Sequence, residues 1–301
     1  MDTTYTGTLQ ISVVSALRMT PIPGATVTVS YTGDPDSPLE TMTTDESGQT
    51  PTITLDAPPR ELSLSPDITA QPYSEYNIQV TAEGFEPVLV SGSEILAGEF
   101  SLQPIRMNPL NVTEEEEKVV VIPAHTLFGE YPPKIPEEEI KPMNETGEIV
   151  LSRVVIPEYV IVHDGVPEDP TARNYWVRYK DYIKNVASSE IYPTWEPAAI
   201  RANILAIISF ALNRVYTEYY PSRGYPFNIT ASTAYDQKFI KGRNIFENIS
   251  QMVDEIFNSY IRRTGFVEPL AAKFCNGTTT TCDGLSQWGS QAMAEQGADS
   301  V

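Results

Sequence analysis

Several residue types are scarce in this sequence, and each shortage excludes a class of protein. The 301 residues include only two cysteines and two histidines, too few for a disulfide-rich scaffold. The 20 lysines and arginines are outnumbered by 40 aspartates and glutamates, and the formal charge of −20 repels phosphate backbones and anionic lipid surfaces. No uninterrupted apolar run is long enough to span a bilayer. We therefore expect neither a nucleic acid nor a membrane as a partner.

The cysteines and histidines also bear on cofactors. Six residues separate Cys275 from Cys282, a spacing compatible with a small loop-closing disulfide or with two free thiols. His125 and His163 lie far from both cysteines in the sequence, and neither stands in a context typical of nucleophilic catalysis. No glycine-rich phosphate-binding or dinucleotide-binding pattern is present. We expect no metal and no cofactor.

The first third of the chain alternates apolar and polar residues in short runs. β-Branched residues are frequent in these runs, and Gly, Pro, Asp and Asn separate them, a pattern typical of a β-sandwich. The runs cover residues 9–14, 25–31, 49–55, 76–82, 86–91 and 99–105. The turn sequences at 23–27, 44–48 and 82–85 resemble those of the transthyretin-like, carboxypeptidase-regulatory sandwich. We expect an all-β domain over residues 1–107, acting as a spacer or as a binding or inhibitory module.

Residues 108–148 differ in composition from what precedes them. Four consecutive glutamates occupy 114–117, prolines and glutamates dominate 132–139, and periodic apolar positions are few. This composition is typical of an extended, solvated linker. The alternative is a pro-region whose cleavage activates the protein, because exposed linkers are where proteases cut.

Residues 149–301 have mainly helical periodicity. Short strand-like runs precede the helices at 150–156, 158–163 and 175–179, and a polar, β-leaning stretch covers 228–240. A helix is then predicted from Arg243, with its apolar residues on one stripe that includes Ile245 and Ile249. We expect a mainly α (α+β) domain behind the β-sandwich.

Two helices and the turn between them are the centre of this second domain. Apolar residues from Tyr182 to Ala187 predict an amphipathic helix that ends at Glu190. Pro197 suits the first turn of a second helix, over about 198–219, which is apolar nearly all round and should be buried.

Glu190 is the first candidate for a catalytic group. It stands beside Tyr192 and Trp195, and apolar neighbours raise the pKa of a carboxyl by penalising its charged form. A carboxyl that keeps its proton near neutral pH can act as the general acid that cleaves a glycosidic bond.

Two sequence blocks carry a resemblance to a known family. The first is Asn185–Glu190, followed by Trp195 and Ala199–Ala206, and the second is Leu285–Gly297. Both resemble, in order, the signature of the SpoIID family of peptidoglycan lytic transglycosylases. The resemblance implies cleavage of the MurNAc–GlcNAc β-1,4 bond with formation of 1,6-anhydro-muramic ends. It also implies that Glu190 is general acid and base, with no second carboxylate required.

The resemblance also implies where such a protein acts and how it is activated. Clostridial relatives act on the peptidoglycan of the spore cortex during germination, are made as zymogens, and are activated by a subtilisin-like protease. They also carry a C-terminal wall-binding module, so we expect the natural protein to continue beyond residue 301. The first residues, 1–9, lack the basic and apolar regions of a secretory signal. We therefore expect synthesis in the cytoplasm of the mother cell and location in the spore cortex or cell wall.

Further side chains are candidates for binding the substrate. Flat rings pack against sugar faces, and Ser286 and Gln287 can offer hydrogen bonds, although a helix N-cap is the plainer role for Ser286. The ring candidates are Tyr192, Trp195, Tyr235 and Trp288. Asp236 is the best second carboxylate, with a loop-capping role as its alternative.

Two alternative functions stay open. A muramidase-type hydrolase would use Glu190 together with Asp236. A non-catalytic wall-binding or scaffold protein is the other alternative, because residues 208–210 read Ile-Ser-Phe where the family often has Arg-Thr-Tyr, and Trp288 replaces a tyrosine.

Overall fold

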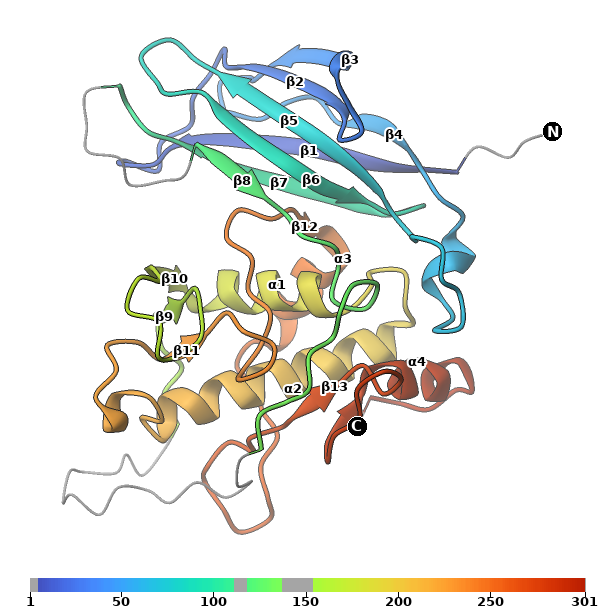
Figure 1. Ribbon diagram of the computed structural model, residues 1–301, viewed down its shortest axis with the longest axis vertical. Helices are drawn as coiled ribbons and strands as arrows, with labels where there is room; N and C mark the ends of the chain where they lie inside the picture. The colour runs from blue at the N-terminus through green and yellow to red at the C-terminus, as the bar shows by residue number, and fades with distance from the viewer. Residues whose placement is uncertain (1–4, 111–117, 137–153, 301) are drawn as a thin grey trace. The chain divides into compact units, whose positions relative to one another are not determined.

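The computed structural model describes residues 5–110, 118–136 and 154–300 (Figure 1). Contacts between Cα atoms divide the chain into two compact units. The first, which we call the sandwich unit, consists of Met1–Ala124 and Ile240–Asn248. The second, the helical unit, consists of His125–Phe239 and Ile249–Val301. The chain therefore passes from the first unit to the second, returns to the first at Ile240, and leaves it again.

The sandwich unit contains two sheets with the orders β12-β7-β1-β4 and β3-β2-β5-β6-β8. Its strands are β1 (Tyr5–Ser15), β2 (Thr26–Tyr31), β3 (Asp34–Thr43), β4 (Ile53–Ala57), β5 (Ser74–Thr81), β6 (Val88–Ile95), β7 (Phe100–Met107), β8 (Val119–Val121) and β12 (Ile245–Phe246). A short 3-10 helix, η1 (Arg60–Ser63), follows β4. The expected β-sandwich is confirmed.

The sandwich core follows from the period-two pattern of its strands. In β1 the side chains of Leu9, Ile11 and Val13 are completely buried, while the residues between them are partly exposed. Val27 and Val29 of β2 meet them in the same core cluster. The sequence pattern did not predict β3, because its ten residues are almost all exposed and polar, with two prolines. It is the edge strand of its sheet, where such residues are tolerated.

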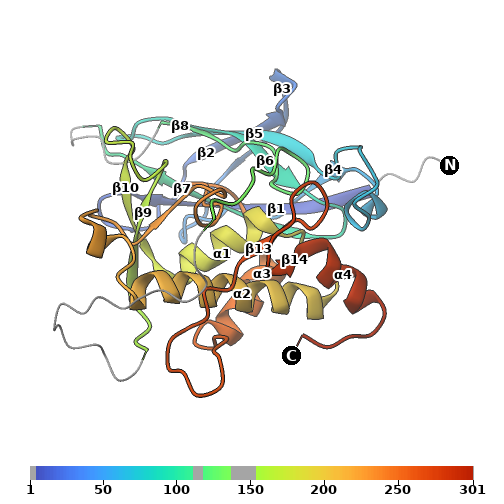
Figure 2. The same ribbon diagram turned by 60° about the horizontal axis from the view of Figure 1, so that its bottom comes forward.

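In the described residues, the helical unit contains a mixed three-stranded sheet, one pair of parallel strands and four α-helices. Its elements are β9 (Tyr159–His163), β10 (Asn174–Arg178), α1 (Tyr179–Glu190), α2 (Pro197–Tyr216), η2 (Pro221–Arg223), β11 (Ile229–Thr230), most of α3 (Glu247–Ile256), β13 (Phe274–Cys275), β14 (Leu285–Ser286) and α4 (Gln287–Glu295). The strands form sheets of order β10-β9-β11 and β13-β14. Figure 2 shows α4 alongside the N-terminal half of α2, and these two helices are in contact.

The helix α2 is the centre of the helical unit. Pro197 lies in its first turn, as expected, and the residues from Ile204 to Arg214 are buried apart from Leu205. By length and composition α2 could cross a membrane, and it is the only such helix in the ranges described. In this structure 72% of the apolar stretch of α2 is buried inside the protein, as in the core helix of a globular domain.

The structure differs from the expected boundaries at two places. Residues 119–121 of the expected linker form β8, which pairs in parallel with β6, and residues 125–136 belong to the helical unit. The helix expected from Arg243 begins at Glu247, because Ile245 is instead in β12, paired with Leu102 of β7. Residues 111–117 and 137–148 of the expected linker and residues 150–153 of the expected strand at 150–156 lie outside the described residues.

Candidate active site

Glu190 is the last residue of α1, and its side chain is completely buried. Tyr182, Ile183 and Val186 hold the apolar stripe of α1 in the core, each with no exposed surface. The helix ends at Glu190, and the next residue, Ile191, takes an extended conformation two positions before Pro193. Helix α1 therefore delivers a carboxylate into the interior of the helical unit.

The carboxylate of Glu190 is held by two neutral donors. The backbone N–H of Lys238 donates to its Oε1 at 2.8 Å, and Gln287 Nε2 lies 3.4 Å from its Oε2. The same Gln287 nitrogen donates to the Glu190 carbonyl at 2.9 Å. Burial raises the pKa of Glu190 above its ordinary value, while the charge of Lys134 and these donors oppose the rise. In the described part of the chain no arginine forms an ion pair with Glu190.

Gln287 contacts Glu190 because of its position at the start of α4. It is the first residue of α4 and is fully buried. The preceding residue, Ser286, is the N-cap of α4, and its Oγ accepts a hydrogen bond from Gly289 N at 3.0 Å. The plainer role of Ser286 is thus the observed one, while Gln287 contacts the predicted catalytic group.

A segment whose place the sequence pattern did not predict packs on Tyr192, two residues after Glu190. We call residues 125–136 the strap. The ring of His125 stacks on Tyr192 with 4.5 Å between centroids. Tyr131 is buried, and its carbonyl accepts a hydrogen bond from Thr280 Oγ1 at 2.8 Å. Its hydroxyl lies 3.4 Å from the carbonyl of Phe274, to which it donates.

Lys134 completes the seating of the strap. Its Nζ donates to the carbonyls of Thr233 at 2.7 Å and Asp236 at 2.9 Å. The next residue, Ile135, donates its N–H to the carbonyl of Ala234 at 2.8 Å. The charge of Lys134 lowers the pKa of Glu190, and the charge of Glu190 adds to the effect of burial in raising the pKa of Tyr131. The strap is therefore fastened to residues 233–236, and the charge of its lysine acts on Glu190.

Three of the four rings expected to line a groove are buried together. Trp195 and Trp288 lie 4.9 Å apart between centroids, and Tyr192 meets each of them edge-on at 6.1 Å. The exposed fractions of Tyr192, Trp195 and Trp288 are 2%, 2% and 8%. In this state the rings form a core cluster beneath His125 of the strap, and they are not available to a sugar.

Asp236 is fully engaged by the protein. Arg214 Nε pairs with its Oδ1 at 2.7 Å, and its Oδ2 accepts from the Tyr220 hydroxyl at 2.8 Å. The backbone N–H and hydroxyl of Thr230 donate to the same Oδ2, at 2.8 and 2.7 Å. All of these groups are buried. The arrangement favours the structural alternative for Asp236, in which it ties the loop at 230–236 to α2.

A small cavity in the helical unit borders the strap, and a larger one lies near it. Tyr235, which is half-buried, and Asp236 line the smaller cavity of about 10 Å³, and Lys134 and Ile135 of the strap form one of its walls. This volume holds about one water. A larger cavity of about 550 Å³, mostly apolar, lies against α2 and shares Lys273 with the smaller one. Its volume is typical of a ligand pocket, although Glu190 is not among its lining residues.

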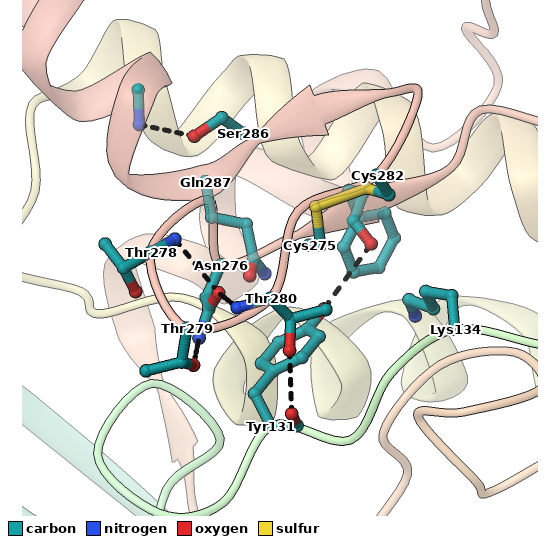
Figure 3. The surroundings of a disulfide bond; sticks show 12 residues. Tyr131, Lys134, Cys275, Asn276, Thr278, Thr279, Thr280, Cys282, Ser286 and Gln287 are labelled. Carbon is teal, nitrogen blue, oxygen red and sulfur yellow. Dashed lines mark hydrogen bonds between the residues drawn. A yellow bond between two sulfur atoms is a disulfide. The ribbon is translucent and has the colours of Figure 1, made fainter.

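The two cysteines form a disulfide, which settles the alternative that the sequence left open. The closed loop is ordered by Asn276, whose Oδ1 accepts the backbone N–H groups of Thr278 at 3.1 Å and Thr280 at 2.9 Å. Figure 3 shows this loop beside Tyr131 and Lys134 of the strap. Gly277, with φ of 79°, sits where a Cβ would come 1.8 Å from Ser286 Oγ, so no other residue fits there.

Removing the disulfide should destabilise the helical unit and loosen the strap. The double variant Cys275→Ala/Cys282→Ala is expected to lose about 2–3 kcal/mol of unfolding free energy, the chain-entropy value for a loop of this size. Thermal unfolding with and without reductant measures it. Reductant should lower the Tm of the wild type and leave that of the double variant unchanged. An equal effect of reductant on both proteins would contradict a stabilising disulfide.

The raised pKa of Glu190 has a measurable effect on stability. A carboxyl whose pKa is raised on folding stabilises the folded state below its unfolded pKa of 4.5, and that stabilisation is lost as the pH rises through the folded value. Glu190→Gln removes the titration and keeps the shape. We expect equal Tm values for variant and wild type near pH 4. At pH 8 the variant should have the higher Tm, by about 2–4 °C for each kcal/mol that the ionised carboxyl costs the wild type. A variant that is less stable at pH 8 would contradict the direction of the shift.

No cluster of three or more metal-ligating side chains occurs within the described ranges. His163 stacks on Phe227 at 4.3 Å, and its Nδ1 and Nε2 lie within hydrogen-bonding distance of Asn174 Oδ1 and the Val166 carbonyl. His125 stacks on Tyr192. Both histidines therefore have structural surroundings.

Comparisons with known proteins show limited likeness. No protein-family model matches the chain, and no curated protein matches it. Similar solved structures include the Bacillus anthracis TIE protein (14% identity, TM-score 0.25, 35% of this chain and 17% of that one), the minor pilin GBS52 of Streptococcus agalactiae (13%, 0.25, 38% and 49%) and the 5-hydroxyisourate hydrolase of Klebsiella pneumoniae (18%, 0.23, 34% and 90%). The chain thus spans less than half of the first two proteins. At these TM-scores none of the likenesses supports a statement about activity.

The residues that the sequence analysis missed are those of the strap and the backbone donor of Lys238. Tyr131 and Lys134 sit in a proline-rich, acidic stretch without periodicity, and they act through contacts with residues about a hundred or more positions away. The only local signal was the mixture of an aromatic and a basic side chain among prolines at 131–136.

Proposed function

We propose that this protein is a latent peptidoglycan lytic transglycosylase. The observation that carries the proposal is Glu190, a completely buried glutamate whose pKa is raised and whose partners are neutral donors, at the position that matches the catalytic glutamate of the SpoIID family. Burial favours the protonated form of the carboxyl, which is the form that a general acid requires, while the two donors and Lys134 oppose it.

The chemistry needs only this one side chain. Protonated Glu190 donates its proton to the glycosidic oxygen as the bond to C1 of the muramic acid breaks. The C6 hydroxyl of the same sugar then bonds to C1, and its proton returns to the Glu190 carboxylate. The products are a free 4-hydroxyl on the departing sugar and a 1,6-anhydro-muramic end. No water is consumed, and the enzyme ends in its starting protonation state.

Latency follows from the position of the strap. Glu190 has no exposed surface, so a glycan strand cannot reach it in this arrangement. Tyr131 and Lys134 of the strap lie near the carboxyl, and Lys134 and Ile135 form a wall of the small cavity. Displacing the strap would remove Lys134 and Ile135 from the wall of the small cavity and take Tyr131 and Lys134 away from the carboxyl. We propose that a cut C-terminal to the strap, near residue 150, permits this displacement.

The substrate and setting follow from the resemblance of the two sequence blocks. The order of a β-sandwich, an acidic linker and a SpoIID-like domain resembles most the clostridial spore cortex-lytic enzyme SleC. We therefore propose spore cortex peptidoglycan as the substrate, a subtilisin-like protease as the activator, and the spore cortex or cell wall as the location.

The hydrolase alternative is less well supported. It needs a second carboxylate that can activate water or attack the sugar. Both oxygens of Asp236 are occupied by Arg214, Tyr220 and Thr230, all buried. With its oxygens engaged by these buried groups, Asp236 is not placed to contact a water or a sugar.

A digestion experiment tests whether the protein is catalytic at all. A site for a sequence-specific protease is introduced within residues 137–153 of the full chain, and cut and uncut proteins are incubated with purified cortex peptidoglycan. The proposal predicts soluble glycan fragments with the cut protein and far fewer with the uncut one. Sedimentation of the protein with the cortex, without any new glycan ends from either form, would favour the non-catalytic wall-binding alternative.

A further inference from the structure

The sandwich unit is not built from the N-terminal part of the chain alone. Residues 240–248, which we call the clip, come from the C-terminal half but belong to this unit by their contacts. Within the clip, β12 extends the first sheet by pairing with β7, with Ile245 opposite Leu102 and Phe246 opposite Ser101. Figure 1 shows β12, in orange, at the edge of the blue and green sandwich.

A buried ion pair joins the clip to β6. Arg243 Nη2 lies 2.8 Å from Glu94 Oε2, and neither side chain has more than 1% of its surface exposed. Asn244 doubles the connection, because its Nδ2 donates to the Glu94 carbonyl at 2.8 Å and its Oδ1 accepts from the Glu94 N–H at 3.2 Å. The buried carboxylate of Glu94 is therefore paired with an arginine of the clip.

The clip also completes the apolar core of the sandwich. Ile240 is a member of the same core cluster as Ile11 and Val90, and Phe246 has no exposed surface. Gln103 of β7, itself completely buried, donates its Nε2 to the carbonyl of Gly242 at 2.8 Å. Without the clip, the sandwich would lose an edge strand, part of its core and the partner of Glu94.

From these contacts we infer that the β-sandwich remains bound to the C-terminal part of the protein after the chain is cut between residues 137 and 153, with the clip as its binding segment. The sandwich is then a permanent component of the processed protein. This inference does not depend on the lytic activity.

The test uses the full chain with the engineered protease site, cut to completion. Size-exclusion chromatography with light scattering should give one particle with the mass of the intact chain and both fragments present. This result should persist on dilution to nanomolar concentration. Elution of the two fragments as separate species would overturn the inference.

Two variants identify the clip as the link. Arg243→Ala leaves the Glu94 charge buried without its partner, and we expect it to weaken association of the cut fragments at least about a hundredfold. The matched control is Arg262→Ala, an exposed arginine of the same half, which should leave association unchanged. Cut Arg243→Ala fragments that associate as tightly as the wild type would overturn the role of the clip.

A second measurement covers the case in which Arg243→Ala does not fold. Hydrogen exchange of the cut wild-type protein reports on the amides of residues 240–248 directly. Protection equal to that of the uncut chain supports the inference, and loss of that protection after cutting contradicts it.

Discussion

The uncut double variant Tyr131→Ala/Lys134→Ala is expected to cleave cortex peptidoglycan about a hundred to a few thousand times faster than the uncut wild type. Truncating a buried aromatic side chain costs about 3–5 kcal/mol of packing, and this loss falls on the seated strap. Lys134→Ala also removes the two hydrogen bonds to the carbonyls of Thr233 and Asp236. Each 1.4 kcal/mol taken from the closed state raises the open fraction about tenfold, and activity follows that fraction.

The control for this prediction is Glu130→Ala, an exposed position in the same strap, which should leave the activity of the uncut chain unchanged. The Tm of the helical unit should fall only slightly in the double variant, because the strap is peripheral to the α1–α2 core. An uncut double variant that stays folded and is no more active than the wild type would show that the strap does not cause latency.

Glu190→Gln, introduced into the cut protein, is expected to lower the rate of glycan cleavage by about 10²–10⁴-fold. This range is the usual contribution of a positioned general acid or base. The amide keeps the shape of the carboxyl and can still accept the N–H of Lys238, so the loss is chemical and the fold is preserved. The release of soluble cortex fragments per unit time measures the effect.

Glu196→Gln is the matched control for this substitution, because it makes the same chemical change at an exposed glutamate close by in the sequence. Its activity should equal that of the wild type. A cut Glu190→Gln protein with unchanged Tm at acidic pH and full activity would remove Glu190 from the mechanism.

The parts of the fold that sequence reasoning could predict are those with regular periodicity. The strands β1 and β2 alternate buried and exposed residues, and α1 repeats apolar residues at helical spacing, so both patterns report burial directly. Pro197 located the start of α2 for the same local reason. These features depend on neighbours within a few positions.

The parts that could not be predicted depend on distant partners. Ile245 has the spacing of a helical stripe, but it lies in a strand because it pairs with Leu102 of β7. The strap carries a linker composition, yet Tyr131 and Lys134 bind residues that follow about a hundred or more positions later. The sequence pattern likewise predicted that Tyr192, Trp195 and Trp288 line a groove, but a local pattern cannot show that these rings pack on one another.

The contacts that surround Glu190 and the strap are therefore ones that a local pattern cannot reveal. The disulfide loop between Cys275 and Cys282 holds the strap through Thr280 and stands beside the strand that leads to Gln287. Glu190 accepts hydrogen bonds from Gln287, which follows that strand, and from the backbone of Lys238.

The mass of the glycan ends released by the cut protein tests the central proposal most directly. Mass spectrometry of cortex digests should show terminal muramic residues lighter by one water than reducing ends, because the C6 hydroxyl replaces water as the attacking group. Those ends should be absent from digests made with Glu190→Gln. Reducing ends with the full mass, still formed by the wild type, would contradict the lyase and identify a hydrolase.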